Sequence, residues 1–507
     1  MSSRPVSYSS GLTVSPALFW GLLLTTLAVR LYAVLVSPLE PSVDEAQYWL
    51  WGQSPQLGYY SKPPLIAWIL AGTSSIFDAM TGGQLIGLRI SAPLLHVLTA
   101  VFLWRAGRLL FSDNAGRLAA LLWVTMPAVG LGSFVMSTDT PMLMFWSAGL
   151  YCLVRSNVSA AQPDYRWIAL AGFCVGLATL AKYAGLYFIL SFIFWLTTIS
   201  FHKPSQKLKL FGVFCAAAVI TSSPTWLWNY SNGFVTLFHL GENANIALGG
   251  PEQNGTLFAR FSEGAFEGVA KFWGAQFAVF GPFTLALLIF SLTGLSSKNR
   301  YNRLHLFIWP VLLLMTGLAF LKEANANWAV AAYPAAALLL GQFIAASRNK
   351  LIPFLGRTAL LVNMLLCGVL VVATAQGSLG PLAPASDPLR HLRGWSDLAK
   401  MTETQVRRTD ARTIIAYDRQ SAALLHWYLR NIDVEIVLPR LGPGQGNHYH
   451  RTYPLSASAP RPLLVLTSDD QPPTKLPVIA KWQGPRARYD IQISTRDRRQ
   501  IWFWLSD

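Results

Sequence analysis

The stretch ALFWGLLLTTLAVRLYAVLVS, residues 17–37, decides the class of fold. Its single charged residue is Arg30, and its 21 residues match the length of about 20 that an α-helix needs to cross about 30 Å of hydrocarbon. Similar apolar windows recur along the chain. Eleven of them are predicted to span a membrane, at about 17–37, 84–104, 118–134, 141–154, 167–181, 184–200, 210–223, 272–295, 304–321, 328–346 and 358–376.

Composition supports this prediction. The 507 residues are 53% hydrophobic and only 13% charged, which is about half the usual fraction for a soluble domain. The net charge of +16 does not indicate a nucleic-acid-binding protein, because the basic residues form small groups between the apolar windows. All four cysteines lie inside such windows, so they suggest neither a disulfide framework nor a metal cluster. We therefore expect an all-α polytopic membrane protein.

The basic residues also predict which loops face the cytoplasm. Every alternate loop between the windows carries Lys or Arg, and such loops remain on the cytoplasmic side. The other loops, and the C-terminal tail after an odd number of spans, then share the opposite side of the membrane. The residues of those loops that carry charge include Asp44, Glu45, Lys62, Asp139, Lys182 and Lys322. Scattered acidic and basic candidates can thus converge on one face of the membrane.

The domain organisation follows from where the apolar character stops. Residues 1–376 are predicted to form the transmembrane catalytic domain, 377–390 a linker rich in Gly, Pro and Ser, and 391–507 a small soluble α/β domain. Two apolar but interrupted stretches, at about 46–77 and 224–271, are poor spanning helices and are expected to lie along the membrane surface.

The first outer loop contains the strongest functional signal. It reads PSVDEAQYWLW at 41–51 and GYYSKPPL at 58–65, and so combines Asp44, Glu45 and Lys62 with aromatic side chains. Acidic residues after Pro-Ser also suit the start of a helix, and the lysine also suits a side chain that extends to the headgroups. A carboxylate beside the bilayer is costly without a partner or a task, however, and these groups suit a site that handles a sugar joined to a phosphate.

Other outer loops offer supporting residues, each with a simpler alternative. Asp139 follows Ser137 and Thr138, either of which is able to cap the next helix, but a second acidic loop on the same face favours a functional pair with Asp44. For Lys182 the simpler alternative is a lysine that anchors a helix at the edge of the membrane. His239 with Glu242 could ligate a metal, although no second histidine stands at ligand spacing.

The chain resembles the GT-C class of polyprenyl-phosphate-sugar-dependent glycosyltransferases, which includes protein O-mannosyltransferases, lipid A aminoarabinose transferases and rhizobial galacturonosyltransferases. The matching motifs are Asp44-Glu45 with Tyr48-Trp49-Leu50-Trp51, Tyr59-Tyr60-Ser61-Lys62-Pro63-Pro64-Leu65, Ser137-Thr138-Asp139, Ala181-Lys182-Tyr183, Trp228-Asn229, Asn327-Trp328 and Tyr333-Pro334. The resemblance implies a multi-pass protein of a bacterial inner membrane, with the active site and the C-terminal domain on the periplasmic side. It implies that Asp44 is the catalytic base, supported by Asp139 and Glu45. It also implies donor-phosphate contacts from Lys62, Lys182 and Tyr60, and substrate contacts from Tyr59, Asn327, Trp328, Tyr333 and His239.

The resemblance further implies an inverting transfer from a polyprenyl-phosphate sugar to a lipid or glycolipid acceptor, with lipid A or lipopolysaccharide core favoured. No nucleotide or redox cofactor is expected. A divalent metal stays open, but Ser61 stands where the aminoarabinose branch has a metal-holding glutamate, so a zinc site of that type is not predicted. Galacturonic acid, aminoarabinose and mannose are all open, with a preference for a uronic acid because of the lysines. The alternatives are a transporter or flippase of polyprenyl-linked sugars and a non-catalytic scaffold.

Overall fold

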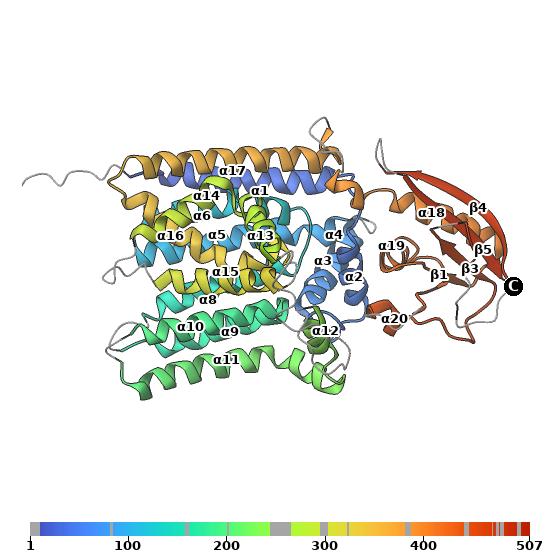
Figure 1. Cartoon of the computed structure of the whole chain (residues 1–507), viewed down its shortest axis with the longest axis horizontal. Coiled ribbons are helices and arrows are strands. Elements are labelled where there is room, and N and C mark those ends of the chain that lie inside the picture. The colour runs from blue at the N-terminus through green and yellow to red at the C-terminus, as the bar shows by residue number, and fades with distance from the viewer. Residues whose placement is uncertain are drawn as a thin grey trace, which may run out of the picture. The chain divides into compact units, whose positions relative to one another are not determined.

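The computed structural model describes most of the chain, and its helices and strands are labelled in Figure 1. The described residues are 11–81, 85–157, 162–199, 202–243, 265–294, 303–321, 324–380, 387–440, 446–468, 470–472, 476, 481–493 and 498–506. The chain divides into two compact units. The first comprises Met1–Leu35, Lys62–Ile66 and Arg89–Val371, and the second comprises Val36–Ser61, Ala67–Leu88 and Val372–Asp507.

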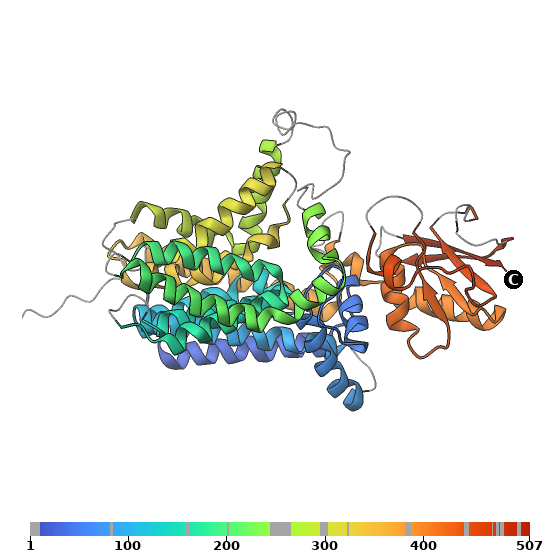
Figure 2. The ribbon, with the colours of Figure 1, turned by 90° about the horizontal axis from the view of Figure 1, so that it is seen from below.

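The first unit is a bundle of apolar helices. They are α1 (Pro16–Val36), α5 (Ser91–Leu110), α6 (Asp113–Thr125), α7 (Pro127–Gly132), α8 (Asp139–Arg155), α9 (Tyr165–Ala181), η1 (Tyr183–Leu186), α10 (Tyr187–Thr197), α11 (Pro204–Ser231), α12 (Val235–Asn243), α13 (Ala265–Phe280), α14 (Pro282–Phe290), η3 (Ser291–Gly294), α15 (His305–Leu321), η5 (Ala326–Ala332), α16 (Tyr333–Ala346) and α17 (Leu351–Gln376). Most of the long helices run along a common direction (Figures 1 and 2). A single large cluster of buried Leu, Ala, Phe and Trp side chains joins them.

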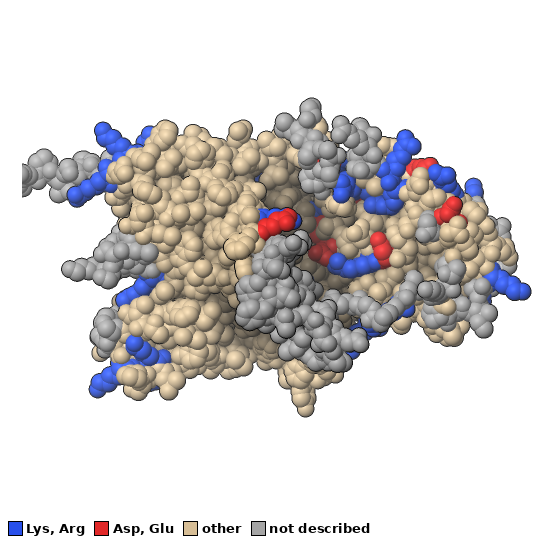
Figure 3. Space-filling model, viewed as in Figure 1, with Lys and Arg blue, Asp and Glu red and all other residues tan. Residues whose placement is uncertain are grey.

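This unit makes the chain a multi-pass membrane protein. Among the described residues, five helices are long and apolar enough to cross a membrane, and a bent pair of helices would make a sixth span. Several shorter apolar helices stand beside them, so the predicted number of eleven spans stays a prediction. On the face shown in Figure 3, basic side chains gather at the end of the bundle on the left of the view, and uncharged surface follows them.

The bundle depends on close approach of its helices at glycines. A Cβ atom at Gly341 of α16 would stand 2.5 Å from the carbonyl oxygen of Ala115 in α6. A Cβ atom at Gly107 of α5 would stand 2.6 Å from the Cα atom of Gly116, also in α6. Helix α6 is therefore packed against two neighbours at backbone distance, which only the smallest residue allows.

A break between α6 and α7 shapes the interior of the bundle. The N–H that would continue the helix is missing at Pro127, so carbonyl groups at the end of α6 need other donors. The buried guanidinium of Arg30 in α1 donates to the carbonyl oxygen of Val124 at 2.5 Å, and the thiol of Cys367 in α17 donates to that of Thr125 at 3.1 Å. An arginine inside an apolar helix thus has a structural partner.

Two predicted boundaries differ from the structure. The continuous apolar window at 272–295 is instead the helices α13 and α14, which meet at 110°. Gly281 lies between them with φ of +96°, and its missing Cβ makes room for Asn363, whose side-chain oxygen would be 2.2 Å from that atom. The predicted interfacial stretch at 224–271 also begins differently, because α11 continues through Pro224 to Ser231 before α12 starts.

The second unit joins the helices of the first outer loop to the C-terminal part of the chain. Its helices are α2 (Val43–Gln53), most of α3 (Leu65–Thr81), α4 (Ile86–Arg89), η7 (Pro388–Leu392), α18 (Trp395–Thr409), α19 (Arg419–Tyr428) and α20 (His448–Thr452). The strands β1 (Thr413–Ile415), β2 (Glu435–Val437), β3 (Leu463–Thr467), β4 (Gln483–Gln492) and β5 (Arg498–Ser506) form one sheet in the order β2-β1-β3-β5-β4. Strands β1, β2 and β3 are parallel, whereas β5 pairs antiparallel with both β3 and β4.

The small C-terminal α/β domain is confirmed. The β-rich stretches at 413–417, 434–438, 462–466, 489–493 and 501–504 predict strands, the stretch at 421–429 predicts a short helix, and each has a counterpart here. The amphipathic α18 was not predicted. The interrupted stretch at 46–77, whose breaks predict two short helices, corresponds to α2 and α3, and its position along a membrane surface stays a prediction. The predicted limits at 376 and 391 also stay predictions, because compactness groups the loop helices with the C-terminal part.

The glycine contacts predict a difference between two substitutions. Gly341→Ala should lower the midpoint of thermal unfolding of the purified protein, because overpacking at such a contact costs about 1–3 kcal/mol. Gly317→Ala, in α15, is the matched control, since a Cβ atom there meets nothing within 4 Å. It should leave the midpoint unchanged or raise it, because alanine favours the helix. Equal midpoints for the two variants would contradict the close packing of α6 on α16.

Candidate functional site

The first unit brings three of the predicted site residues together. The ammonium group of Lys182 donates to Oδ1 of Asp139 at 2.7 Å, and the side-chain amide of Asn327 donates to Oδ2 at 3.0 Å. The two ionic side chains are only 17% and 14% exposed, so this pair is shielded from bulk water. Three segments that are far apart in the sequence thus meet at one carboxylate.

Local structure explains why these side chains meet. Asp139 is the first residue of α8, Lys182 ends α9 in an extended conformation, and Asn327 lies in η5. Thr138 stands at the N-cap of α8 but makes no capping hydrogen bond through its side chain. Thr138 therefore does not cap the helix through its side chain, as the simpler alternative for this motif required.

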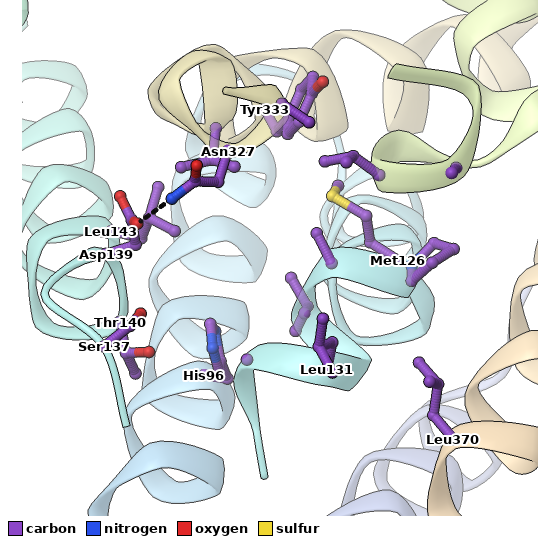
Figure 4. Close-up of a pocket in the computed structure, with 18 of the residues that line it drawn as sticks. His96, Met126, Leu131, Ser137, Asp139, Thr140, Leu143, Asn327, Tyr333 and Leu370 are labelled. Carbon is purple, nitrogen blue, oxygen red and sulfur yellow. Dashed lines mark hydrogen bonds between the residues drawn. The ribbon is translucent and has the colours of Figure 1, made fainter. Parts of the chain in front are cut away.

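The carboxylate of Asp139 also borders a cavity of about 760 Å³ within the first unit. Its walls are mostly apolar and come from α5, α7, α8, α13, α17 and the η5–α16 segment. Figure 4 shows Asp139 and Asn327 facing each other, with Ser137, Thr140 and His96 on the same side of the cavity. An apolar cavity with a few polar groups at one side suits an amphiphilic ligand.

Other predicted residues of this unit have structural partners. The hydroxyl of Tyr333 is hydrogen-bonded to the side chain of Gln276, and its ring stacks on Phe280 with centroids 4.3 Å apart. Tyr333 still borders the cavity. Trp328 packs against the core, and His239 lies in α12, partly buried. Substrate contacts of these three residues stay predictions.

In the second unit, Asp44 and Glu45 open the helix α2 and have different roles. Glu45 is completely buried and forms a capping box with Ser42: its carboxylate accepts from the Ser42 N–H at 2.9 Å, and its own N–H donates to the Ser42 hydroxyl at 3.1 Å. Asp44 points outward, with 57% of its side chain exposed. The helix-start alternative therefore accounts for Glu45 and leaves the Asp44 carboxylate available.

Arg419, which the sequence analysis missed, holds that carboxylate. This first residue of α19 donates through Nη2 to Oδ1 of Asp44 at 2.5 Å and through Nε to the side chain of Gln47 at 3.0 Å. Burial by itself would lower the pKa of Arg419, but the charge and hydrogen bond of Asp44 outweigh that effect and raise it. In the described part of the chain, Oδ2 of Asp44 has no hydrogen bond or ion pair, so only one of the two carboxylate oxygens is engaged.

No pattern in the sequence pointed to Arg419, since it is one of many arginines in the C-terminal part. The contact between α2 and α19 has further support. The rings of Trp49 and Trp427 pack edge to face at 4.8 Å, and the guanidinium of Arg430 lies near both, 5.8 Å from the Trp49 ring centroid and 4.6 Å from that of Trp427.

The hydroxyl groups of two neighbouring tyrosines donate hydrogen bonds to backbone carbonyl oxygens. The Tyr59 ring stacks on Trp51 at 4.5 Å, and its hydroxyl donates to the Trp51 carbonyl at 2.9 Å. Burial raises the pKa of Tyr59 to about 12. Tyr60 donates to the carbonyl oxygen of Gly446 at 2.9 Å. Lys62 is partly buried and belongs to the first unit.

The predicted residues are therefore divided between the units. Asp139, Lys182 and Asn327 meet in the first, whereas Asp44 and Glu45 lie in the second. A single site that contains both Asp44 and Asp139 stays a prediction. Lys322 and the Glu242 side chain lie outside the described residues. Within the part of the chain that the structure describes, no three His, Cys, Asp or Glu side chains gather as metal ligands.

Comparisons with known proteins agree with this geometry. A model of the dolichyl-phosphate-mannose-protein mannosyltransferase family matches residues 61–228. The lipid A galacturonosyltransferase RgtD of Rhizobium johnstonii is 26% identical over 482 residues, which are 92% of this chain and 95% of that protein. The structure of ArnT from Cupriavidus metallidurans bound to undecaprenyl phosphate has a TM-score of 0.63 at 13% identity, over 97% of this chain and 98% of that chain.

The apo structure of the same ArnT has a TM-score of 0.56 at 14% identity, with the same coverage. Similarity at this level of identity establishes a common fold. The family model and the relative both describe enzymes that transfer sugars. Together these findings confirm the predicted resemblance to the GT-C class.

Two buried histidines predict how the stability of the second unit depends on pH. Burial lowers the pKa of His426 and that of His448 to about 4. The unfolded chain, with a histidine pKa of about 6.5, binds more protons than the folded chain between these values, so stability is present at pH 7 and falls as the pH drops. We expect a loss on the order of 1–2 kcal/mol for each histidine between pH 7 and pH 5.

Thermal unfolding of the full-length protein at a series of pH values measures this effect. In the wild type the ring centroids of His426 and Tyr453 are 4.5 Å apart, and His426→Phe keeps an aromatic ring at this position. This variant should flatten the dependence of the unfolding temperature on pH. His391→Gln, at an exposed position, should leave it unaltered. If all three proteins lose stability identically on acidification, another group is responsible.

Proposed function

We propose that this chain, a glycosyltransferase of the GT-C class, transfers a sugar with inversion from a polyprenyl-phosphate donor to a lipid acceptor. The observation that carries the proposal is the Asp139–Lys182 pair, which lies at the polar side of an apolar cavity inside a membrane bundle. Such a site accommodates a molecule with an apolar chain and a charged head. The similarity to RgtD supports lipid A or lipopolysaccharide core as the acceptor.

In the proposed reaction, an acceptor hydroxyl attacks the anomeric carbon of the donor sugar. The new glycosidic C–O bond forms as the bond between that carbon and the phosphate oxygen breaks, and the electron pair leaves with the polyprenyl phosphate. Asp44 accepts the proton of the attacking hydroxyl through Oδ2, the oxygen that Arg419 does not contact. No oxidant, reductant or nucleotide enters this step.

The departing phosphate needs cations, because its negative charge is no longer shared with the sugar. Lys62 and Lys182 are proposed to stabilise it, as point charges suited to phosphate. Lys182 is held by Asp139, so a phosphate that approaches would share the ammonium with this carboxylate. Asp139 thereby positions Lys182, while Asn327 orients Asp139.

Arg419 is proposed to position the catalytic base. Its two-point contact with Asp44 and Gln47, one turn apart on α2, fixes the orientation of the carboxylate. This arrangement gives the C-terminal domain a part in the reaction. We place this face of the protein and the C-terminal domain in the periplasm, on the basis of the alternating basic loops.

A transfer assay tests the proposed function. The wild type and Asp44→Asn receive a lipid A acceptor and polyprenyl-phosphate-linked galacturonic acid, aminoarabinose or mannose, and mass spectrometry identifies the products. We expect the wild type to add one of these sugars and Asp44→Asn to lose at least about a hundredfold in rate, the low end for a general base.

Asp410→Asn is the control, because Asp410 has a φ of +49°, which asparagine tolerates. It should transfer as the wild type does. Full activity of a folded Asp44→Asn variant would refute Asp44 as the base. Failure of the wild type with every donor would favour the transporter alternative.

Variants of Arg419 test its positioning role. Arg419→Gln should lower kcat about ten- to a hundredfold, since a hydrogen bond to a charged group contributes about 1.5–3 kcal/mol, and should leave the KM for the donor nearly unchanged. Arg419→Lys should recover part of kcat, because an ammonium reaches one of the two acceptors. The unfolding temperature should stay close to that of the wild type, since the aromatic contacts of α2 with α19 persist.

Arg407→Gln is the matched control, because Arg407 is exposed and pairs with Glu403 on α18. It should not change kcat. A rise in KM equal to the fall in kcat, or no recovery with lysine, would contradict the positioning role.

A further inference from the structure

A groove on the first unit lies between the end of α10 and the start of α11. Its volume is about 480 Å³. Pockets of about 300–1,000 Å³ are typical of sites for small ligands. The side chains that line the groove are Ile193, Leu196, Thr197, Lys207, Leu208 and Phe211. Four of these six are apolar, and among them Lys207 alone carries a charge.

The groove lies at the end of the bundle opposite the pair formed by Asp139 and Lys182. Asp139 begins α8 and Lys182 follows α9, so the end of α8 and the start of α9 lie away from that pair. The ammonium of Lys209, near the start of α11, is 5.2 Å from the ring centroid of Tyr165, which begins α9. In Figure 3 basic side chains stand at the lower left, where Figure 1 shows the start of α11.

The positive charge of Lys207 is not neutralised within the described part of the chain. Its side chain is partly buried and makes no hydrogen bond or ion pair with a described residue. Helices α10 and α11 contain no acidic residue, whereas Lys203 and Lys209 stand close to Lys207 in the sequence. Asp164 is an acidic residue at this end of the bundle, where it caps α9 by accepting from the N–H of Arg166 at 2.9 Å. Basic groups therefore predominate around the groove.

The apolar wall of the groove faces outward from the bundle. Leu208 is 71% exposed, and it lies on α11, one of the helices long and apolar enough to cross a membrane. An exposed leucine near the end of such a helix meets lipid, and a lysine beside it extends its ammonium to the level of the headgroups. The groove thus presents an apolar surface to lipid chains and a cation to their headgroups.

This combination selects a lipid with a negative headgroup. A lysine ammonium is a point charge suited to a phosphate, and the apolar side chains suit an acyl chain. A zwitterionic headgroup would bring a second cation close to the lysines, whereas an anionic headgroup is attracted by all of them. Inorganic phosphate would leave the apolar wall uncovered. Polyprenyl phosphate has similar parts, but its proposed place is beside Lys182 at the other end of the bundle.

We propose that the groove between α10 and α11 binds an anionic phospholipid, with the lipid phosphate on Lys207 and an acyl chain along the apolar side chains. This site is separate from the proposed transfer reaction, because none of its residues lies near Asp139 or Lys182. A lipid that contacts both helices favours the folded state, since it binds the folded chain and not the unfolded one.

Variants of Lys207 test the site. Lys207→Gln removes the charge, and Lys207→Arg keeps it. Lys350→Gln is the matched control, because Lys350 is exposed, directly precedes α17 and does not line the groove. Without added phospholipid, all three variants should unfold at the temperature of the wild type, since neither lysine has a side-chain partner in the described part of the chain.

Native mass spectrometry of the purified full-length proteins measures the binding of phosphatidylglycerol and of phosphatidylcholine with the same acyl chains. We expect the wild type to prefer phosphatidylglycerol. Lys207→Gln should weaken its binding about fivefold, the effect of one lysine near an anionic lipid surface. Lys207→Arg and Lys350→Gln should keep the affinity of the wild type, and no variant should change the affinity for phosphatidylcholine. Added phosphatidylglycerol should raise the unfolding temperature of the wild type more than that of Lys207→Gln.

Three results would overturn the site. Equal affinity of the wild type for the two phospholipids would show that the groove does not select a negative headgroup. An equal loss in Lys207→Gln and Lys350→Gln would assign the preference to the overall charge of the protein. If polyprenyl phosphate required Lys207 and phosphatidylglycerol did not, the groove would belong to the donor lipid. Because each readout is binding or unfolding, failure of the proposed transfer reaction leaves this test unaffected.

Discussion

The structure depends on one constraint: a carboxylate in a packed protein needs a cation or hydrogen-bond donors. For Asp139 the donors are Lys182 and Asn327, which belong to two other helical segments. For Asp44 the donor is Arg419, which belongs to the C-terminal part of the chain. In both cases the partner is distant in sequence, so each carboxylate ties several segments together while keeping its own orientation.

The same constraint acts on the main chain inside the bundle. A helix broken at Pro127 exposes carbonyl groups where no water is available, and Arg30 and Cys367 supply the missing donors from α1 and α17. The break makes α7 a short separate helix in the wall of the cavity. Thus the sequence feature that interrupts the helix also shapes the wall of the cavity.

The second unit shows how the C-terminal part of the chain packs against the helix that carries Asp44. Helix α19 contacts α2 through paired aromatic rings and through Arg419, so the loop that carries the proposed base is packed against a folded domain. Because the aromatic contacts hold the helices together, the arginine is left to orient the Asp44 carboxylate. Glu45 stays in the capping box and fixes where α2 begins.

The sequence by itself determined the membrane class, the C-terminal α/β domain and the chemical candidates in the outer loops, because apolar length, strand periodicity and isolated charges are local properties. It also indicated that Asp139 and Lys182 share a face, since the positive-inside rule acts loop by loop. Only the tertiary structure decided which cation holds which carboxylate, that Arg419 contacts Asp44, and that Asp139 borders a cavity. Such facts depend on contacts between segments far apart in the chain, and no local pattern encodes them.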